Sequence, residues 1–171
     1  MSIKIESKGI VVDGILLPFT TNKIKTKDGF INNLQGSSVD NWNLSGKKMW
    51  YYQKWRCMRR RASLPHKYPD VSVHDDWKLF SNFILDISKL SGACIANFEL
   101  DKDLHNLDNN KIYSKHTCTL LPKSINVLLA KKINTKKKSD LLLQELQKYS
   151  NNLDIHTFNK LTLMANNYAS N

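Results

Sequence analysis

The 171-residue chain lacks any apolar run that approaches the length of a membrane span. Its first residues, MSIKIESKG, also lack the charged segment followed by an apolar one that marks a secretory signal peptide. We therefore expect an intracellular protein with no membrane partner. The length suits one domain with its own core, or one domain with a small addition.

Cysteine is scarce and widely spaced. The chain has three cysteines, Cys57, Cys94 and Cys118, and no two of them form a C-x-x-C pair. An odd number at such spacing argues against both a disulfide framework and a zinc knuckle. The five histidines add no recurrent zinc-site spacing to these cysteines.

Acidic residues are also few, because 15 Asp and Glu face 26 Lys and Arg, which leaves a net charge of +11. Such an excess attracts polyanions through phosphate contacts and counterion release. We expect nucleic acid, DNA first, as the partner. An acidic protein partner or an anionic surface is the alternative, and a merely solvated lysine surface would have the same composition.

The first 46 residues indicate strands and turns. Asp13-Gly14 separates two short apolar runs, which is a strong signal for a β-hairpin, and Asp28-Gly29 repeats the signal more weakly. Residues 35–46 are rich in Ser, Asn and Gly and predict a surface loop.

Two helices are predicted in the middle of the chain. The first covers residues 50–62, with one apolar face formed by Tyr51, Trp55, Met58 and Ala62. A second is expected to begin at Asp75 and to end at Ser91-Gly92. The first helix also carries a basic group that we expect to contact DNA phosphates: Arg56, Arg59, Arg60 and Arg61.

The last 41 residues, 131–171, are expected to form a basic linker and a helical hairpin. Ser139 or Asp140 should begin the first helix, Asn151-Asn152 should end it, and Asp154 should cap the second. The lysines of the linker add salt-sensitive affinity when they lie close to DNA. They are Lys131, Lys132, Lys136, Lys137 and Lys138.

Four sequence blocks carry a family resemblance. In chain order they are YYQKWRCMRRRA, KYPDVSVHDDWKLFSNF, LDKDL and KIYSKHTCTLLPKSIN. Their order and spacing resemble phage and prophage HNH endonuclease-like proteins over residues 47–130. Residues 140–165 look like the closing helical segment of that family. Many members carry a three-stranded DNA-binding domain before this segment, and here only the lysine-rich linker stands in its place.

The resemblance implies an α+β fold in three parts. These are an N-terminal β-hairpin region (1–46), a ββα-metal core with flanking helices (47–130), and the basic linker with the C-terminal helical hairpin (131–171). In such a core, a strand and a helix hold a divalent ion, usually magnesium, against the scissile phosphate, while a histidine activates water.

The resemblance also assigns roles to particular residues. Asp101 matches the acidic metal ligand and Asn126 the ligand on the helix, a pair that suits a hard cation. Lys102 occupies the position of the general base, and Thr117 that of the residue that orients the base. Because a lysine is normally protonated at neutral pH, His105 and His116 are alternative sources of a base.

Two functions follow from this pattern. The first is an HNH-like DNA-binding protein, cytoplasmic in a bacterial host, that nicks or cleaves DNA with magnesium. The alternative is a nuclease-derived module without catalysis, which binds nucleic acid or a protein partner. The replacement of the base by Lys102 favours the alternative, whereas the retained pair of ligands favours the first.

Overall fold

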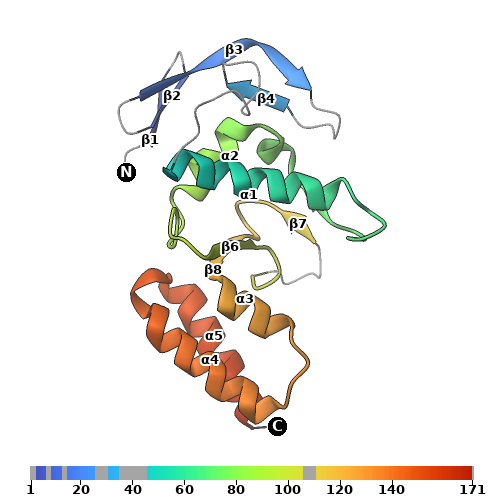
Figure 1. The fold of residues 1–171 in the computed structure, drawn as a ribbon, viewed down its shortest axis with the longest axis vertical. Coiled ribbons are helices and arrows are strands. Elements are labelled where there is room, and N and C mark those ends of the chain that lie inside the picture. Colours follow the sequence, from blue (N-terminus) through green and yellow to red (C-terminus); the bar gives the residue numbers. More distant parts are fainter. Residues whose placement is uncertain are drawn as a thin grey trace.

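The computed structural model describes residues 3–6, 9–12, 15–25, 31–34, 46–105 and 111–170 (Figure 1). It shows a mixed α+β protein in which helices accompany small sheets. Within this part of the chain, no helix is both long and apolar enough to cross a membrane.

The N-terminal part forms an antiparallel sheet in the order β1 (Ile3–Glu6), β2 (Gly9–Val12), β3 (Ile15–Lys25) and β4 (Ile31–Leu34). Val12 pairs with Ile15 across Asp13-Gly14, so the predicted hairpin is confirmed. Lys25 pairs with Ile31, so the strands on either side of the second predicted turn are paired, whereas Asp28-Gly29 itself lies outside the described residues. Of the predicted loop 35–46, residues 35–45 lie outside the described part. In Figure 1 the sheet lies over α2 (Phe80–Ile87), on the side opposite the C-terminal helices.

The aromatic core is built where α1 (Gly46–Ala62) meets α2. Trp55 is fully buried on α1, and its indole Nε1 donates a hydrogen bond of 2.9 Å to the carbonyl of Trp77. The indole of Trp77 in turn donates to Asp86 Oδ2 at 2.9 Å. Both buried indole N–H groups are therefore satisfied, which removes the cost of placing them in an apolar core.

The predicted start of the second helix was wrong. Residues Asp75–Lys78 form a short 3-10 helix, η2, and α2 begins only at Phe80. The break lies at Leu79, whose backbone is extended, with φ −92° and ψ 124°. The Asp75-Asp76 pair starts only this separate 3-10 helix, because the backbone must extend at Leu79 before Phe80 and Phe83 can enter the core.

Two short strand pairs lie beneath α1. β5 (Ser72–Val73) runs parallel to β7 (Ile112–Tyr113), and β6 (Phe98–Asp101) runs antiparallel to β8 (Thr119–Pro122). α3 (Lys123–Ala130) begins directly after β8. In the register of this pair, Asp101 faces Thr119 and Phe98 faces Pro122, so the acidic end of β6 lies beside the start of β8.

The C-terminal hairpin consists of α4 (Thr135–Tyr149) and α5 (Ile155–Ala169), joined by the 3-10 turn η3 (Ser150–Asn152). The break at Asn151-Asn152 and the cap at Asp154 are confirmed, because Asp154 Oδ1 accepts from the Thr157 N–H at 2.8 Å. The predicted start of the first helix was wrong. Asn134 caps it, and Thr135 rather than Ser139 begins it.

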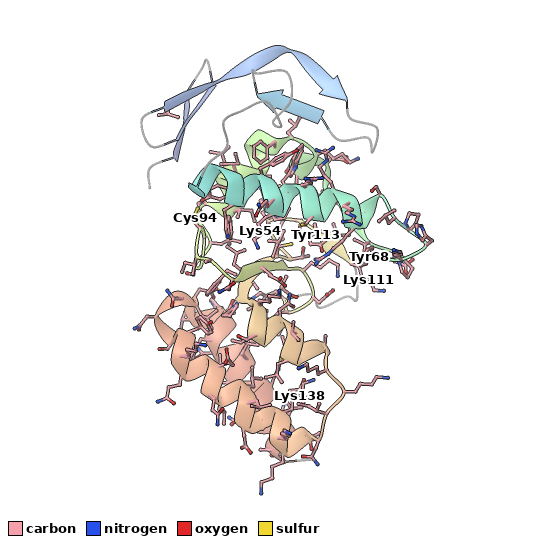
Figure 2. The ribbon with its side chains drawn as sticks, viewed as in Figure 1. Lys54, Tyr68, Cys94, Lys111, Tyr113 and Lys138 are labelled. Carbon is pink, nitrogen blue, oxygen red and sulfur yellow. The ribbon has the colours of Figure 1, made fainter. Side chains whose placement is uncertain are left out.

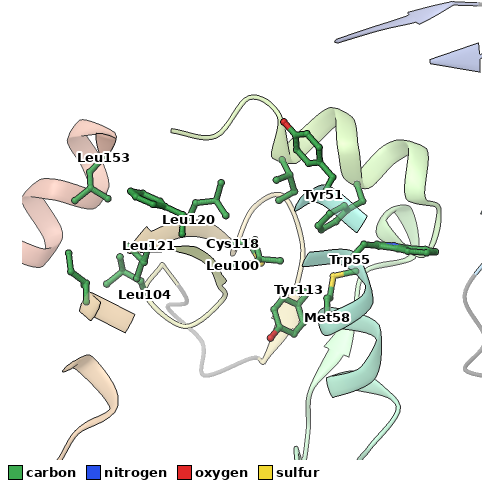
Figure 3. Packing of buried hydrophobic residues seen from close by; sticks show 14 of the residues in the cluster. Tyr51, Trp55, Met58, Leu100, Leu104, Tyr113, Cys118, Leu120, Leu121 and Leu153 are labelled. Atoms are coloured by element: carbon green, nitrogen blue, oxygen red, sulfur yellow. The ribbon is translucent and has the colours of Figure 1, made fainter. Parts of the chain in front are cut away.

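A single hydrophobic cluster connects these layers (Figure 3). Trp55 and Met58 from α1 lie on one side, Leu100 and Leu120 from the β6–β8 pair lie in the middle, and Leu153 lies at the C-terminal hairpin. The predicted apolar face of α1 is confirmed as core, with Ala62 only partly buried. The β6–β8 pair is thus packed between α1 and the C-terminal hairpin.

Gly92 provides a test of this packing. Its φ is +86°, a backbone conformation that a residue with a side chain adopts only under strain. A methyl group added at its Cα would also overlap the Phe98 ring. We expect Gly92→Ala to lower the free energy of unfolding by about 2 kcal/mol or more, as overpacking and strain add. Urea unfolding would measure this loss. The exposed neighbour is the control, since Ser91→Ala should change stability by less than about 0.5 kcal/mol. Equal midpoints for the two variants would contradict the expectation.

Candidate nucleic-acid interface between β6 and α3

A cavity of about 250 Å³ lies where the end of β6 meets α3 and the C-terminal end of α1. It brings Asp101 and Asn126 together, which the sequence had predicted as a pair. Figure 2 labels Tyr68 and Tyr113, which lie below the C-terminal half of α1 and line the same cavity. Its lining consists of Arg61, Tyr68, Val71, Leu100, Asp101, Lys102, Asp103, Tyr113 and Asn126.

The carboxylate of Asp101 is buried at the end of β6, with 8% of the residue exposed. Its Oδ1 accepts hydrogen bonds from the backbone N–H groups of Asp103, at 3.0 Å, and Leu104, at 2.8 Å. Burial raises the pKa of this carboxyl, and the two N–H donors oppose part of that rise. Among the described residues, Oδ2 has no hydrogen-bond partner.

Asn126 is oriented by Glu99. Its Nδ2 donates to Glu99 Oε2 at 3.1 Å. Only the nitrogen of an amide can donate to a carboxylate, so the Asn126 carbonyl oxygen points away from Glu99. Glu99 was not among the residues predicted from the sequence. The available signal was the two-residue period of a strand, which places Glu99 on the same face of β6 as Asp101.

Two cations complete the charge pattern of the cavity. Arg61 Nη1 donates to the Tyr113 hydroxyl at 2.8 Å. Burial alone would lower the pKa of Arg61. The hydrogen bond to Tyr113 and the electrostatic attraction of the Tyr113 oxygen outweigh this effect, so the pKa of Arg61 is raised. The Lys102 ammonium is paired with the Asp103 carboxylate and lies 5.7 Å from the centre of the Tyr113 ring. Positive and negative groups therefore meet within one small cavity.

The two candidate histidines lie outside this cavity's lining. His105 turns toward α5, where its Nε2 lies 3.0 Å from Thr157 Oγ1. Burial, followed by the nearby Lys160 charge, lowers the pKa of His105. His116 is exposed, and its backbone N–H is bonded to Ser114 Oγ at 3.2 Å. Neither histidine is brought together with Asp101 and Asn126.

Thr117 has a structural contact that its predicted role did not include. Its Oγ1 donates to the Ile112 carbonyl at 2.6 Å and accepts from the Ser114 N–H at 3.2 Å. These bonds hold the turn that joins β7 to β8. Thr117 is also absent from the lining of the cavity, so its role in orienting a base remains a prediction without a contact to support it.

The chemistry of the lining fits a hard cation with few protein ligands. Among the described residues, no group of three His, Cys, Asp or Glu is placed to hold a metal ion. Asp101 Oδ2 and the Asn126 carbonyl oxygen nevertheless offer two oxygen donors at one cavity. Magnesium suits such a site, because it keeps several waters and binds through one or two side chains together with phosphate oxygens.

The basic residues of α1 point in different directions. Arg56 and Arg60 are exposed, which suits the predicted phosphate contacts. Arg59 lies with its guanidinium carbon 4.3 Å from the centre of the Trp55 ring, so it covers the core. Arg61 lines the cavity. A DNA backbone near the cavity would therefore meet Arg60 and Arg61 rather than all four arginines at once.

The lysines after α3 also differ in their exposure to solvent. Lys131, Lys132, Lys136 and Lys137 are exposed, and the last two lie in α4 rather than in a linker. Lys138 differs from these four lysines, and its predicted contact with nucleic acid stays a prediction that no exposed side chain supports. The residue is 8% exposed, and its Nζ donates to the carbonyls of Leu129, at 2.8 Å, and Lys131, at 3.0 Å. The ammonium also lies 4.9 Å from the centre of the Tyr168 ring, so the contacts of Lys138 stabilise the fold.

No protein-family model, curated protein or solved structure matches this chain significantly. The resemblance to HNH endonuclease-like proteins therefore rests on the four sequence blocks alone.

Lys137 and Lys138 are neighbours on α4, and comparing their alanine variants tests whether Lys138 stabilises the fold. We expect Lys138→Ala to lower the free energy of unfolding by about 1–3 kcal/mol, because it removes charged hydrogen bonds to two carbonyls. Lys137→Ala should leave stability within about 0.5 kcal/mol, since its side chain is exposed. Thermal and urea unfolding would measure both changes. A Lys138→Ala variant as stable as Lys137→Ala would contradict the structural role.

Proposed function

We propose that this chain is a DNA-binding protein of the HNH endonuclease-like class. In this proposal, the cavity between β6 and α3 holds a backbone phosphate through a divalent cation, magnesium first. The observation that carries the proposal is the convergence of Asp101 and Asn126 on one cavity that also contains Arg61 and Lys102.

The order of the elements supports this proposal. β6 brings Asp101, its antiparallel partner β8 follows, and α3 brings Asn126 in its first turn. The resemblance implies the same strand, strand and helix order for a ββα-metal core. In such a core Asp101 would be the acidic ligand on the strand and Asn126 the amide ligand on the helix.

The charges of the cavity suit a phosphate diester. Asp101 and Asn126 would hold the cation, which neutralises phosphate charge and polarises the phosphorus–oxygen bonds when it is bound. Arg61 and Lys102 can donate charge-assisted hydrogen bonds to the remaining phosphate oxygens. Outside the cavity, exposed cations such as Arg60 and Lys131 would add contacts that weaken with salt.

The residues around Lys102 favour binding over cleavage. Proton abstraction from water needs an unprotonated group within hydrogen-bond reach. Lys102 is ion-paired with Asp103, and a paired ammonium is a donor rather than a base. His105 contacts Thr157 on the far side of β6 from α1. Metal-dependent nicking is therefore the second candidate function, and it is favoured only by the retained pair of candidate ligands, Asp101 and Asn126, in the cavity.

The role of Asp101 can be tested with a matched amide. In Asp101→Asn, Oδ1 keeps its two backbone donors but the charge is lost. With a chelator present, the variant should bind duplex DNA more tightly than wild type, because a carboxylate repels phosphate. With magnesium, only wild type should gain affinity, by about 10-fold, the effect of about 1.4 kcal/mol. Fluorescence anisotropy at a fixed salt concentration measures both values.

The exposed Asp140 provides the control for the loss of one negative charge. Asp140→Asn should keep the wild-type response to magnesium, since it lies on α4 outside the cavity. If wild type and Asp101→Asn respond to magnesium equally, the cation site is refuted. If wild type binds no DNA even at low salt, the proposed function is refuted as a whole.

The missing base can be supplied in a separate experiment. We expect wild type to leave supercoiled plasmid intact with magnesium or manganese. Lys102→His places an imidazole at the base position, and this variant should convert the plasmid to the nicked form at a rate that the additional Asp101→Asn substitution abolishes. Gel electrophoresis of the plasmid measures the conversion. Nicking by wild type would instead support the second candidate function.

A further inference from the structure

A second cavity, of about 260 Å³, borders the first. The two share Arg61 and Tyr68 in their linings. The second is lined by Cys57, Arg60, Arg61, Leu64, Lys67 and Tyr68. Three of these residues are cations and none is acidic, whereas the first cavity contains Asp101 and Asp103. The charge of the second cavity therefore favours an anion, and no metal is needed to neutralise acidic side chains in its lining.

The loop after α1 holds the aromatic residue of this cavity in place. The Leu64 carbonyl accepts from the backbone N–H groups of both Lys67 and Tyr68, each at 3.0 Å. Pro65 and Pro69 restrict the backbone on either side of this turn. Tyr68 is 40% exposed, so its ring is presented to solvent from a turn that is fixed by hydrogen bonds.

An exposed aromatic ring among cations has the chemistry that binds unpaired nucleotides. A base stacks on the ring while arginine and lysine contact the adjoining phosphates. A base inside a duplex cannot use the ring in this way, because its faces are covered by its neighbours. A cavity of about 260 Å³ also suits one base better than a whole duplex.

We propose that the second cavity binds one unpaired nucleotide of single-stranded DNA. Its base stacks on Tyr68, its phosphate contacts Arg60 and Lys67, and the next phosphate enters the cavity of Asp101 and Asn126. This inference rests on the proposed function and adds the class of DNA that the site takes. It makes single strands, or duplexes with a locally unpaired base, the preferred ligand.

Two ligands test this preference with the 171-residue chain. One is labelled oligothymidine of about 16 nucleotides, the upper size of a single-strand site, and the other is a duplex of equal length. Wild type should bind the single strand more tightly at equal salt. Tyr68→Leu should weaken single-strand binding by about 10-fold, as expected for the loss of one stacked base, and should weaken duplex binding less, because a duplex offers no unpaired base to the ring. Tyr68→Phe keeps the ring and should bind like wild type.

Cys57 provides an independent reporter, because it is exposed and lines the second cavity. Its reaction with a chromogenic disulfide reagent should slow several-fold when oligothymidine is bound and stay unchanged with the duplex. The Cys57→Ser variant shows how much of the reaction with the reagent is due to Cys57. Cys118 contributes little, since it is buried and burial raises the pKa of its thiol to about 12.

The outcomes separate this inference from the proposed function. Equal affinity for both ligands, or an unchanged affinity in Tyr68→Leu, overturns the inference, while a magnesium response that depends on Asp101 leaves the proposed function standing. Tighter duplex binding with no protection of Cys57 also overturns it. Failure of wild type to bind either ligand overturns both. Single-strand preference lost in Tyr68→Leu, kept in Tyr68→Phe and accompanied by protection of Cys57 supports the inference.

Discussion

The pairing of β6 with β8 is the constraint on which the rest of the described structure depends. This ladder fixes Asp101 opposite Thr119 and Phe98 opposite Pro122, and it delivers the chain to the first residue of α3. The backbone N–H of Lys123 also donates to the Asn97 carbonyl at 2.7 Å, which ties the start of α3 to the start of β6. Without this register, Asp101 and Asn126 would not meet.

Local chemistry made much of the fold predictable. The Asp13-Gly14 hairpin, the apolar face around Trp55 and the cap at Asp154 all follow from turn, period and capping preferences that act within a few residues. The start of α4 did not follow from them, because Asn134, Ser139 and Asp140 are all good caps. The choice of Asn134 depends on Lys138, whose ammonium reaches back to carbonyls at the end of α3. A run of lysines gives no sign of such a contact.

The candidate site was predictable only in part, for a related reason. The resemblance identified Asp101 and Asn126, and strand alternation could have identified Glu99. The histidines could not be assigned from sequence, because the direction of the His105 ring is decided by Thr157, a residue far along the chain on α5. The roles of Tyr68 and Arg61 likewise depend on contacts with a loop and with Tyr113.

The position of α3 has a mechanical consequence. Its first turn carries Asn126, and its last carbonyls are gripped by Lys138 of α4. The helix is only eight residues long, so it connects the cavity to the C-terminal hairpin over a short distance. The hairpin is therefore attached directly to the helix that carries Asn126, although none of its described side chains lines the cavity.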